Sequence, residues 1–494
     1  MAFVPSRLRR ALGASSLALL VFSAPAGAES IFTAPSDGFV GSVRGGSSAQ
    51  GQPLYKGGKA TISGSRLTPG QQITLMRGVT ILNPEAPLVV DAEGNFSHEI
   101  QIDDEAATGL QPILVIGENP AAAEVIELKI SPEVPLSGVE KFDIASAPAT
   151  RGLYQVAFSP KSGAVYVAAA VGRPPVRQSA LLKVDAETLE TLATATPPVA
   201  PAPPPRPGAG GPGGAGPGAG GPGGPGGAPQ DDRPPLFAVY GVGVDDANGR
   251  VWVTNTRQNT LAVYDQADLS LVKQFDPGLA THSRDVVVDE ANGRAYVSTS
   301  FENHIVVIDT ATLEILEPVV IQSGKRGETF GTMSLDLDPV GGKLVTVSMG
   351  TNEAAVVDVR TGEAKVIPLP GARGASGAAY DPQEGLIFVA SQQSDNLLIV
   401  KAETGEVLHD VKVGAQPLNV AFEPVERLAY VANRGAGTIT VVNTSGEIVA
   451  NLDAGNLPNQ LRADGKGNVW AVNKARGEDD PTGDRVWRIR PKAQ

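Results

Sequence analysis

One unit repeats along the C-terminal two thirds of the sequence, at an interval of about forty residues. Its clearest copies are VGVDDANGRVWVTNTRQNTLAVYD at Val242–Asp265 and VVVDEANGRAYVSTSFENHIVVID at Val286–Asp309. Each copy predicts a short strand, an Asn-Gly turn, a second strand with an aromatic residue, a polar loop and a third strand that ends at Asp. A unit of this kind and period is typical of β-propeller blades, which are β-sheets arranged around a central channel.

Seven such units can be counted along the chain. They contain Tyr154–Pro160 with Ala164–Ala170, Tyr240–Asp265, Arg284–Asp309, Met333–Asp358, Ser376–Val400, Leu418–Asn443 and Asn459–Arg490. The seventh unit lacks a fourth strand, whereas Glu140–Ser146 precedes the first unit and belongs to none. Because an open ring would leave unpaired strand edges, we expect Glu140–Ser146 to supply the outer strand of the seventh blade. The predicted fold class is therefore all-β, with a seven-bladed β-propeller over residues 138–494.

Residues 53–135 precede the propeller and predict a smaller β-domain. Short apolar or alternating runs between turn residues indicate six or seven strands, namely Lys59–Gly64, Gln72–Met76, Leu88–Asp91, Asn95–Ile102, Pro112–Gly117 and Val125–Ile130. This density of strands favours a small β-sandwich. The GSRLTPG stretch at Gly64–Gly70 and the DAEGNF turn at Asp91–Phe96 resemble bacterial immunoglobulin-like domains, which implies that fold but no ligand. The Gly- and Ser-rich residues 29–52 are expected to form a flexible N-terminal segment.

Residues 1–28 have the pattern of an export signal peptide. Arg7, Arg9 and Arg10 form a basic start, Ala11–Phe22 is an apolar run, and Ala26–Ala28 is a small-residue cleavage site. The apolar run is shorter than the roughly 20 residues that span a bilayer, and no later segment predicts a transmembrane anchor. We therefore expect an exported soluble protein, periplasmic or secreted. The general secretory route and the twin-arginine route, which Arg9-Arg10 suggests, both stay open.

The composition argues against several kinds of site. The chain has no cysteine, which excludes disulfides, thiolate metal sites and covalently attached c-type haem. Its four histidines do not pair at positions i and i+4, so a histidine zinc site is not expected. The net charge of −13 disfavours nucleic acid or an anionic membrane surface as a partner. We predict no cofactor and no metal site.

Residues 197–229 form a low-complexity insertion between the first and second units. Apart from Val199 and Arg206 they are only Pro, Gly and Ala. The insertion lacks the strict period of collagen and has too little apolar surface to offset the entropy of ordering it. We expect a disordered insertion within the propeller, either a tolerated loop expansion or a tether.

The second strands of the repeat carry a recognisable motif. VWVTN at Val251–Asn255 and AYVAN at Ala429–Asn433 resemble the YVTN-repeat propellers, which include the YncE-like exported proteins. The resemblance covers about Gly138–Gln494 and implies a seven-bladed propeller. It leaves the function open, because similar propellers include binding proteins, lactonases and proteins with no known activity.

Propeller geometry brings the residues that open the inner strands to one rim of the central channel. The loop after each second strand returns to the same rim. Most of the opening residues are polar or small, and the predicted ligand-binding residues are Tyr154, Tyr240, His282, Arg284, Asp285, Asn419, Asn459 and Gln460. The alternative is that these residues only line a water-filled channel. No catalytic set is recognisable.

Three long loops are expected at this same rim. They are Gly172–Ser179, the Pro/Gly insertion and Lys474–Asp484, whereas the β-sandwich is expected at the opposite rim. We therefore predict a monomer that binds a protein, peptide or small molecule on the face carrying these loops. The alternative is a lactonase- or lyase-like enzyme at the channel mouth around His282, Arg284 and Asp285. A third hypothesis is an envelope scaffold to which the sandwich docks.

Overall fold

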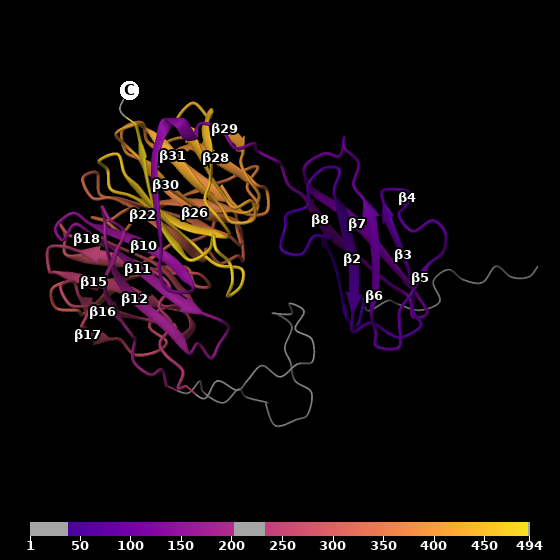
Figure 1. Cartoon of the computed structure of the whole chain (residues 1–494), viewed down its shortest axis with the longest axis horizontal. Helices are drawn as coiled ribbons and strands as arrows, with labels where there is room; N and C mark the ends of the chain where they lie inside the picture. Colours follow the sequence, from indigo (N-terminus) through magenta and orange to yellow (C-terminus); the bar gives the residue numbers. More distant parts are fainter. Residues whose placement is uncertain (1–37, 202–232, 493–494) are drawn as a thin grey trace, which may run out of the picture.

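The computed structural model describes residues 38–201 and 233–492. Figure 1 shows two bodies, an N-terminal pair of sheets and a larger ring of sheets. The expected signal peptide lies outside the described residues, as do residues 202–229 of the expected insertion. Within the described residues, no helix is long and apolar enough to cross a membrane.

The ring consists of seven four-stranded antiparallel sheets, which confirms the predicted seven-bladed propeller. The strands of blades 1 to 3 are β10 (Leu153–Ser159), β11 (Ala164–Val171), β12 (Gln178–Asp185), β13 (Thr191–Ala195), β14 (Val242–Asp245), β15 (Arg250–Asn255), β16 (Thr260–Asp265), β17 (Leu271–Gln274), β18 (Ser283–Asp289), β19 (Arg294–Thr299), β20 (His304–Asp309) and β21 (Ile315–Val320). Blades 4 and 5 contain β22 (Thr332–Asp338), β23 (Lys343–Ser348), β24 (Glu353–Asp358), β25 (Ala364–Pro368), β26 (Ala375–Asp381), β27 (Leu386–Ser391), β28 (Asn396–Lys401) and β29 (Val407–Lys412). Blades 6 and 7 contain β30 (Pro417–Glu423), β31 (Leu428–Asn433), β32 (Thr438–Asn443), β33 (Ile448–Asp453), β34 (Pro458–Ala463), β35 (Val469–Asn473), β36 (Arg485–Pro491) and β9 (Phe142–Pro148).

The outer strand of blade 7 comes from the start of the propeller, as the sequence predicts. Strand β9 pairs with β36 along its whole length, from Phe142 opposite Pro491 to Pro148 opposite Arg485. The expected segment began two residues earlier, but Glu140 lies in a short 3₁₀ turn, η1 (Val139–Lys141). This pairing ties the first strand of the ring to the last and removes both open edges.

The hydrophobic cores lie between neighbouring blades. Every residue of β27 and β31 is buried, because the second strand of each blade is sandwiched between the sheets on either side. The Asn-Gly turn of the repeat forms as expected. Asn248 donates its backbone N–H to Asp245 Oδ1 at 3.0 Å, and Gly249 adopts a positive φ of 65°. The repeat pattern thus fixes the local turns as well as the blade cores.

Residues 42–130 form two facing sheets that share one core, the expected small β-sandwich. One sheet contains β1 (Ser42–Ser47), β2 (Lys59–Ser65) and β6 (Phe96–Gln101); the other contains β3 (Gln72–Arg77), β4 (Thr80–Ile81), β5 (Leu88–Val89), β7 (Gly109–Glu118) and β8 (Ala122–Ile130). Strand β1 corrects the expectation of a flexible segment at 29–52. Its Gly and Ser residues suggested a loop, but it pairs with β2 from end to end, Val43 joins the core, and a Cβ on Gly45 would come within 3.1 Å of Leu128.

The position of the sandwich relative to the propeller corrects a second expectation. In each blade the inner strand begins at one rim, here called the mouth rim, and the loop after the second strand returns to it. Lys129 of β8 donates to Asp395 Oδ1 at 2.7 Å, and Glu127 pairs with Arg373 at 2.6 Å. Both propeller residues lie in mouth-rim loops of blade 5, so the expectation that the sandwich lies at the opposite rim was wrong.

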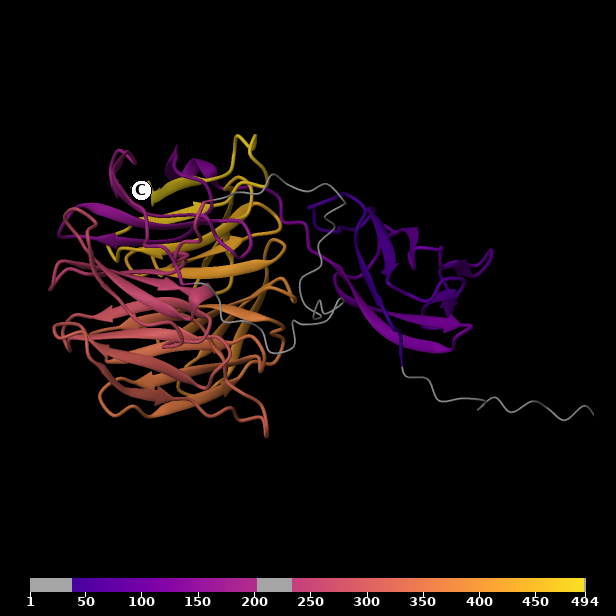
Figure 2. The same ribbon diagram turned by 90° about the horizontal axis from the view of Figure 1, so that it is seen from below.

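The linker between the two bodies explains this position. Strand β9 does begin at the far rim, as expected, but residues 131–141 reach it along the outer edge of blade 6. Asn451 of β33 donates its amide to the Val134 carbonyl at 2.8 Å, Ser137 forms a β-bridge with Asn451, and Lys141 donates to the Val449 carbonyl at 3.2 Å. In Figures 1 and 2 this linker is the covalent connection between the two bodies within the described residues.

The first prediction concerns ring closure. Phe142 is buried between blades 6 and 7, with its ring edge-on to Tyr430 at 6.3 Å between centroids. Phe142→Ala should lower the free energy of unfolding by about 3 kcal/mol or more, since it leaves a cavity in a closed core. Asp143→Ala, at the exposed neighbouring residue, should change it by less than about 0.5 kcal/mol. Urea unfolding followed by tryptophan fluorescence would measure both, and equal midpoints would contradict a role for β9 in holding the ring.

The second prediction concerns the contact between sandwich and propeller. Because the chain has no native cysteine, a pair of introduced cysteines reports on one distance without background. Glu127→Cys with Arg373→Cys should be linked efficiently by a short bifunctional maleimide. Glu127→Cys with Val340→Cys, an exposed position on the far rim, should not be linked. The reverse pattern on a denaturing gel would show that the sandwich lies elsewhere.

Candidate ligand-binding cavity at the channel mouth

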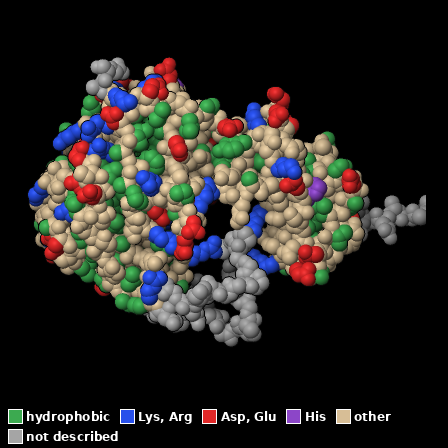
Figure 3. All heavy atoms as spheres, in the orientation of Figure 1, with side chains coloured by type: hydrophobic (Ala, Val, Ile, Leu, Met, Phe, Trp, Pro, Cys, Tyr) green, Lys and Arg blue, Asp and Glu red, His purple; other side chains and the backbone are tan. Residues whose placement is uncertain are grey.

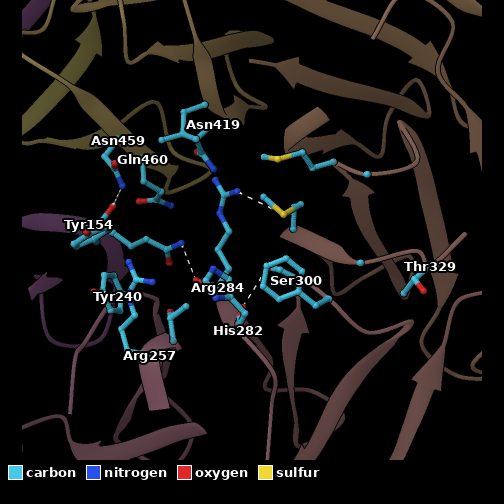
Figure 4. A pocket seen from close by; sticks show the side chains of 18 residues that line it. Tyr154, Tyr240, Arg257, His282, Arg284, Ser300, Thr329, Asn419, Asn459 and Gln460 are labelled. Atoms are coloured by element: carbon cyan, nitrogen blue, oxygen red, sulfur yellow. Dashed lines mark hydrogen bonds between the residues drawn. The ribbon is translucent and has the colours of Figure 1, made fainter. Parts of the chain in front are cut away.

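A cavity of about 600 Å³ opens at the mouth rim of the central channel. Its lining comes from the openings of inner strands and from mouth-rim loops: Tyr154, Gln155, Tyr240, Thr256, Arg257, His282, Arg284, Ser300, Phe301, Thr329, Gly331, Met333, Met349, Gly350, Leu418, Asn419, Asn459 and Gln460. Figure 4 shows these side chains converging from several blades. Seven of the eight predicted ligand-binding residues lie here: Tyr154, Tyr240, His282, Arg284, Asn419, Asn459 and Gln460.

Asp285, the eighth predicted residue, does not line the cavity. Its side chain is buried, with Oδ1 at 3.2 Å from Arg462 Nη2 and Oδ2 accepting the Leu335 backbone N–H at 3.0 Å. Arg462 comes from blade 7 and Asp285 from blade 3, so this ion pair crosses the channel. The register of β18 is irregular between Ser283 and Val286, and these two contacts hold the Asp285 carboxylate away from the cavity that Arg284 lines.

Several polar residues at the channel hold neighbouring blades together. The inner strand of each blade presents a free edge to the channel, and its backbone N–H groups need acceptors. Side chains at equivalent positions of the preceding blade supply them: Gln155 to Val242 at 3.2 Å, Asp285 to Leu335 at 3.0 Å, Ser334 to Ala378 at 2.7 Å, Asn419 to Leu461 at 3.3 Å, and Gln460 to Val156 at 2.9 Å. We call these five contacts the inter-blade belt.

Glycine occupies the equivalent position in the two remaining blades. A Cβ on Gly241 would come within 2.5 Å of the Arg284 carbonyl oxygen, and one on Gly377 within 2.7 Å of Asn419 Cα. In blades 2 and 5 the backbones therefore approach directly, without a side-chain acceptor between them. The belt gives these polar positions a structural role in the ring, and three of them, Gln155, Asn419 and Gln460, also face the cavity.

Arg284 supplies the charge at the centre of the cavity. In Figure 4 its side chain extends from blade 3 across the cavity toward Asn419 of blade 6. Its guanidinium donates to the thioether sulfur of Met333 at 3.8 Å, and among the described residues it forms no ion pair with a carboxylate. Burial lowers its pKa, with nearby Arg434 adding to the effect and Asp285 opposing it.

Three further cations surround the mouth, and each has a neutral partner. Arg257 donates to the Tyr240 hydroxyl at 3.3 Å, Arg434 donates to Asn459 Oδ1, and Lys474 Nζ lies 3.3 Å from the centroid of the Tyr154 ring. The rings of Tyr154 and Tyr240 pack edge-to-face at 4.3 Å. Such cation–aromatic contacts hold the charges in place without neutralising them.

Sequence reasoning missed these three cations, although a signal for them exists. Each follows by one or two positions the Asn that ends a second strand, in the order Asn255, Asn433 and Asn473. The loop after that Asn returns to the mouth rim in every blade. Comparing the first two residues after this Asn in every blade would have placed Arg257, Arg434 and Lys474 beside the inner-strand residues.

Burial, together with the clustered positive charges, lowers the pKa of two basic groups at the mouth. Burial lowers the pKa of Lys474 to about 7, with Arg434 and Arg257 adding to the effect and Asp484 opposing it. The pKa of His282 is also lowered, by burial first and then by Arg257 and Arg284. Both shifts disfavour the protonated form, first because burial withdraws it from water and then because neighbouring arginines repel it.

The remaining wall of the cavity is apolar. Phe301 from the loop after β19, Met333 at the start of β22, Met349 after β23 and Leu418 at the start of β30 line it. Phe301 also packs against the His282 ring at 4.9 Å between centroids. The cavity therefore combines an apolar wall with donors and positive charge, which is the composition of a site for a small molecule.

The third prediction uses the Lys474 titration. Because its native pKa of about 7 lies below that of an unfolded lysine, the unfolded state binds more protons between the two values, and this residue makes wild-type stability rise with pH in that window. Between pH 6 and pH 9 the unfolding free energy of wild type should gain about 2–3 kcal/mol relative to Lys474→Met. Lys466→Met, at an exposed lysine of the same blade, should show no such change. Parallel pH dependences for Lys474→Met and wild type in urea unfolding would refute the prediction.

Comparison with known proteins gives the fold. No protein-family model matches the chain, and no curated protein matches its sequence. Hydrazine synthase from Kuenenia stuttgartiensis is similar in structure, with a TM-score of 0.52 and 15% identity over 70% of this chain and 97% of that chain. The WD40 repeats of RRP9 are similar with a TM-score of 0.53 and 10% identity, over 73% of this chain and 100% of that chain. At such identities the likeness shows a shared β-propeller fold alone.

Proposed function

We propose that this chain is a binding protein that holds a small molecule in the cavity at the channel mouth. The observation that carries the proposal is the cavity itself, about 600 Å³ with an apolar wall and hydrogen-bond donors on one side. Propellers commonly bind their partners on one end of the channel, and here that end is hollowed. A protein partner on the same face would have only the sector of blades 1 to 4, since the sandwich contacts the loops of blades 5 and 7.

The setting of this function is part of the proposal. The basic start and apolar run of residues 1–28 support export to the periplasm or beyond, and the YVTN-like motifs resemble exported YncE-like propellers. The net charge of −13 supports a ligand other than nucleic acid. We propose a monomer in which an immunoglobulin-like sandwich docks on the propeller.

Binding is better supported than the lactonase or lyase alternative. That alternative relied on Asp285 acting beside His282 and Arg284. In the structure Asp285 is committed to Arg462 and to the backbone of blade 4, beneath the cavity. The three residues therefore do not converge on one point where a substrate could react.

The fourth prediction tests the cavity as the binding site. Leu418→Trp places a large side chain in it, whereas Leu271→Trp adds the same side chain on an outer strand of blade 2, where Leu271 is 42% exposed. A small-molecule library should contain compounds that raise the melting temperature of wild type and Leu271→Trp but not of Leu418→Trp. A compound present at 100 times its Kd stabilises by about 2.7 kcal/mol. Compounds that stabilise all three proteins equally would place binding elsewhere and refute the proposal.

A further inference from the structure

The donors in the cavity are directed toward an anion. Asn419 and Gln460 each use their side-chain oxygen in the inter-blade belt, accepting the backbone N–H groups of Leu461 and Val156. This fixes the orientation of both amides, so their NH₂ groups are the ends left for the cavity, which they both line. Arg284 adds a guanidinium, which can only donate.

The charges at the site lack a counter-ion within the described chain. Arg284, Arg257, Arg434 and Lys474 pair with a thioether, a phenol and its ring, an amide oxygen and an aromatic ring, respectively. None of the four forms an ion pair with a carboxylate among residues 38–201 and 233–492. Arg284, Arg434 and Lys474 are partly buried, whereas Arg257 is exposed. A cation that is partly withdrawn from water is unfavourable unless an opposite charge compensates it. A negatively charged ligand would supply that compensation.

The positions of the cations, one inside the cavity and three at its mouth, indicate which kind of anion fits. The Arg284 guanidinium reaches the centre of the cavity, between the amides of Asn419 and Gln460. The other three cations lie at the mouth, where they contact Tyr154, Tyr240 and Asn459. A single planar fork matches the two oxygens of one carboxylate. The apolar wall of Phe301, Met333 and Met349 faces the remaining space and requires an apolar body on the same molecule.

We propose that the cavity binds a small organic carboxylate with an apolar body, its carboxylate on Arg284 and the Asn419 and Gln460 amides, its body against the Phe301–Met349 wall. This inference rests on the proposed small-molecule function and specifies its ligand class. It also explains why a chain of net charge −13 concentrates cations at one recess. Arg257 and Arg434 attract the anion to the mouth, and Lys474 adds to this attraction where the pH lies below its pKa of about 7.

The experiment compares matched pairs of compounds that differ only in charge. Cinnamate with cinnamamide and octanoate with octanamide are titrated against the full-length mature protein by calorimetry, with inorganic phosphate and sulfate as anions without an apolar body. At least one carboxylate should bind tenfold or more tightly than its amide. Arg284→Met should weaken that carboxylate at least tenfold and leave the amide unchanged. Arg294→Met, an arginine of the same blade that pairs with Asp309, should bind as wild type does.

The outcomes separate this inference from the proposed function. Equal binding of amide and carboxylate, or no effect of Arg284→Met, would leave a small-molecule site but overturn the carboxylate assignment. If phosphate or sulfate binds as tightly as the carboxylates, the claim that the ligand needs an apolar body is wrong. If the wild-type protein binds none of the carboxylates, amides or inorganic anions, that result counts against both the small-molecule function and the carboxylate inference.

A second measurement needs no ligand. If Arg284 is an uncompensated charge kept for an anion, Arg284→Met should raise the melting temperature of the free protein by a few degrees, because residues kept for binding commonly reduce stability. Arg294→Met should not raise it. A melting temperature for Arg284→Met below that of wild type would show that the propeller itself compensates the guanidinium, and would overturn the inference.

Discussion

The rest of this molecule depends on how each blade is joined to the next around the central channel. The joints lie between neighbouring inner strands. A propeller places seven strand edges around an axis, and unpaired backbone groups there would be unfavourable. In five blades a side chain of the inter-blade belt accepts the backbone N–H of the next inner strand. In blades 2 and 5, Gly241 and Gly377 let the two backbones approach each other directly. The pairing of β9 with β36 then closes the ring so that the belt is continuous across the junction of blades 7 and 1.

The belt also determines the chemistry of the cavity. An amide that gives its oxygen to a neighbouring backbone can offer only its NH₂ group to a ligand, so Asn419 and Gln460 become donors by virtue of a structural bond. Asp285 shows the complementary case. Its carboxylate accepts the backbone N–H groups of Leu335 and Val286 and pairs with Arg462, which removes it from the cavity and leaves Arg284 as the central charge. Structure and recognition thus share the same side chains at the mouth rim.

Much of the fold could be predicted from the sequence because the repeat has a strong period. The number of blades, the Asn-Gly turns and the use of a segment near Glu140–Ser146 to complete blade 7 all follow from that period and from the need to remove open edges. Strand β1 was not predicted, since glycine and serine carry little strand signal and Val43 alone marks its buried face. The sandwich was placed at the wrong rim because nothing in residues 131–141 reveals that they run along blade 6. Within the site, the inner-strand residues were found by their position in the repeat. Asp285 was assigned to the cavity wrongly, because its ion pair with Arg462 joins two blades that are far apart in sequence.

The docked sandwich has a consequence for kinetics. The sandwich contacts blades 5 and 7 through Asp395 and Arg476. Figure 3 shows Lys and Arg side chains on the sides of the two bodies that face each other. A molecule that enters over blades 5 to 7 passes this contact, and a barrier there slows its arrival and its departure by the same factor. Equilibrium occupancy depends only on the end states, whereas residence time depends on the path. A barrier of this kind lengthens the time that a bound molecule stays and leaves the strength of binding unchanged.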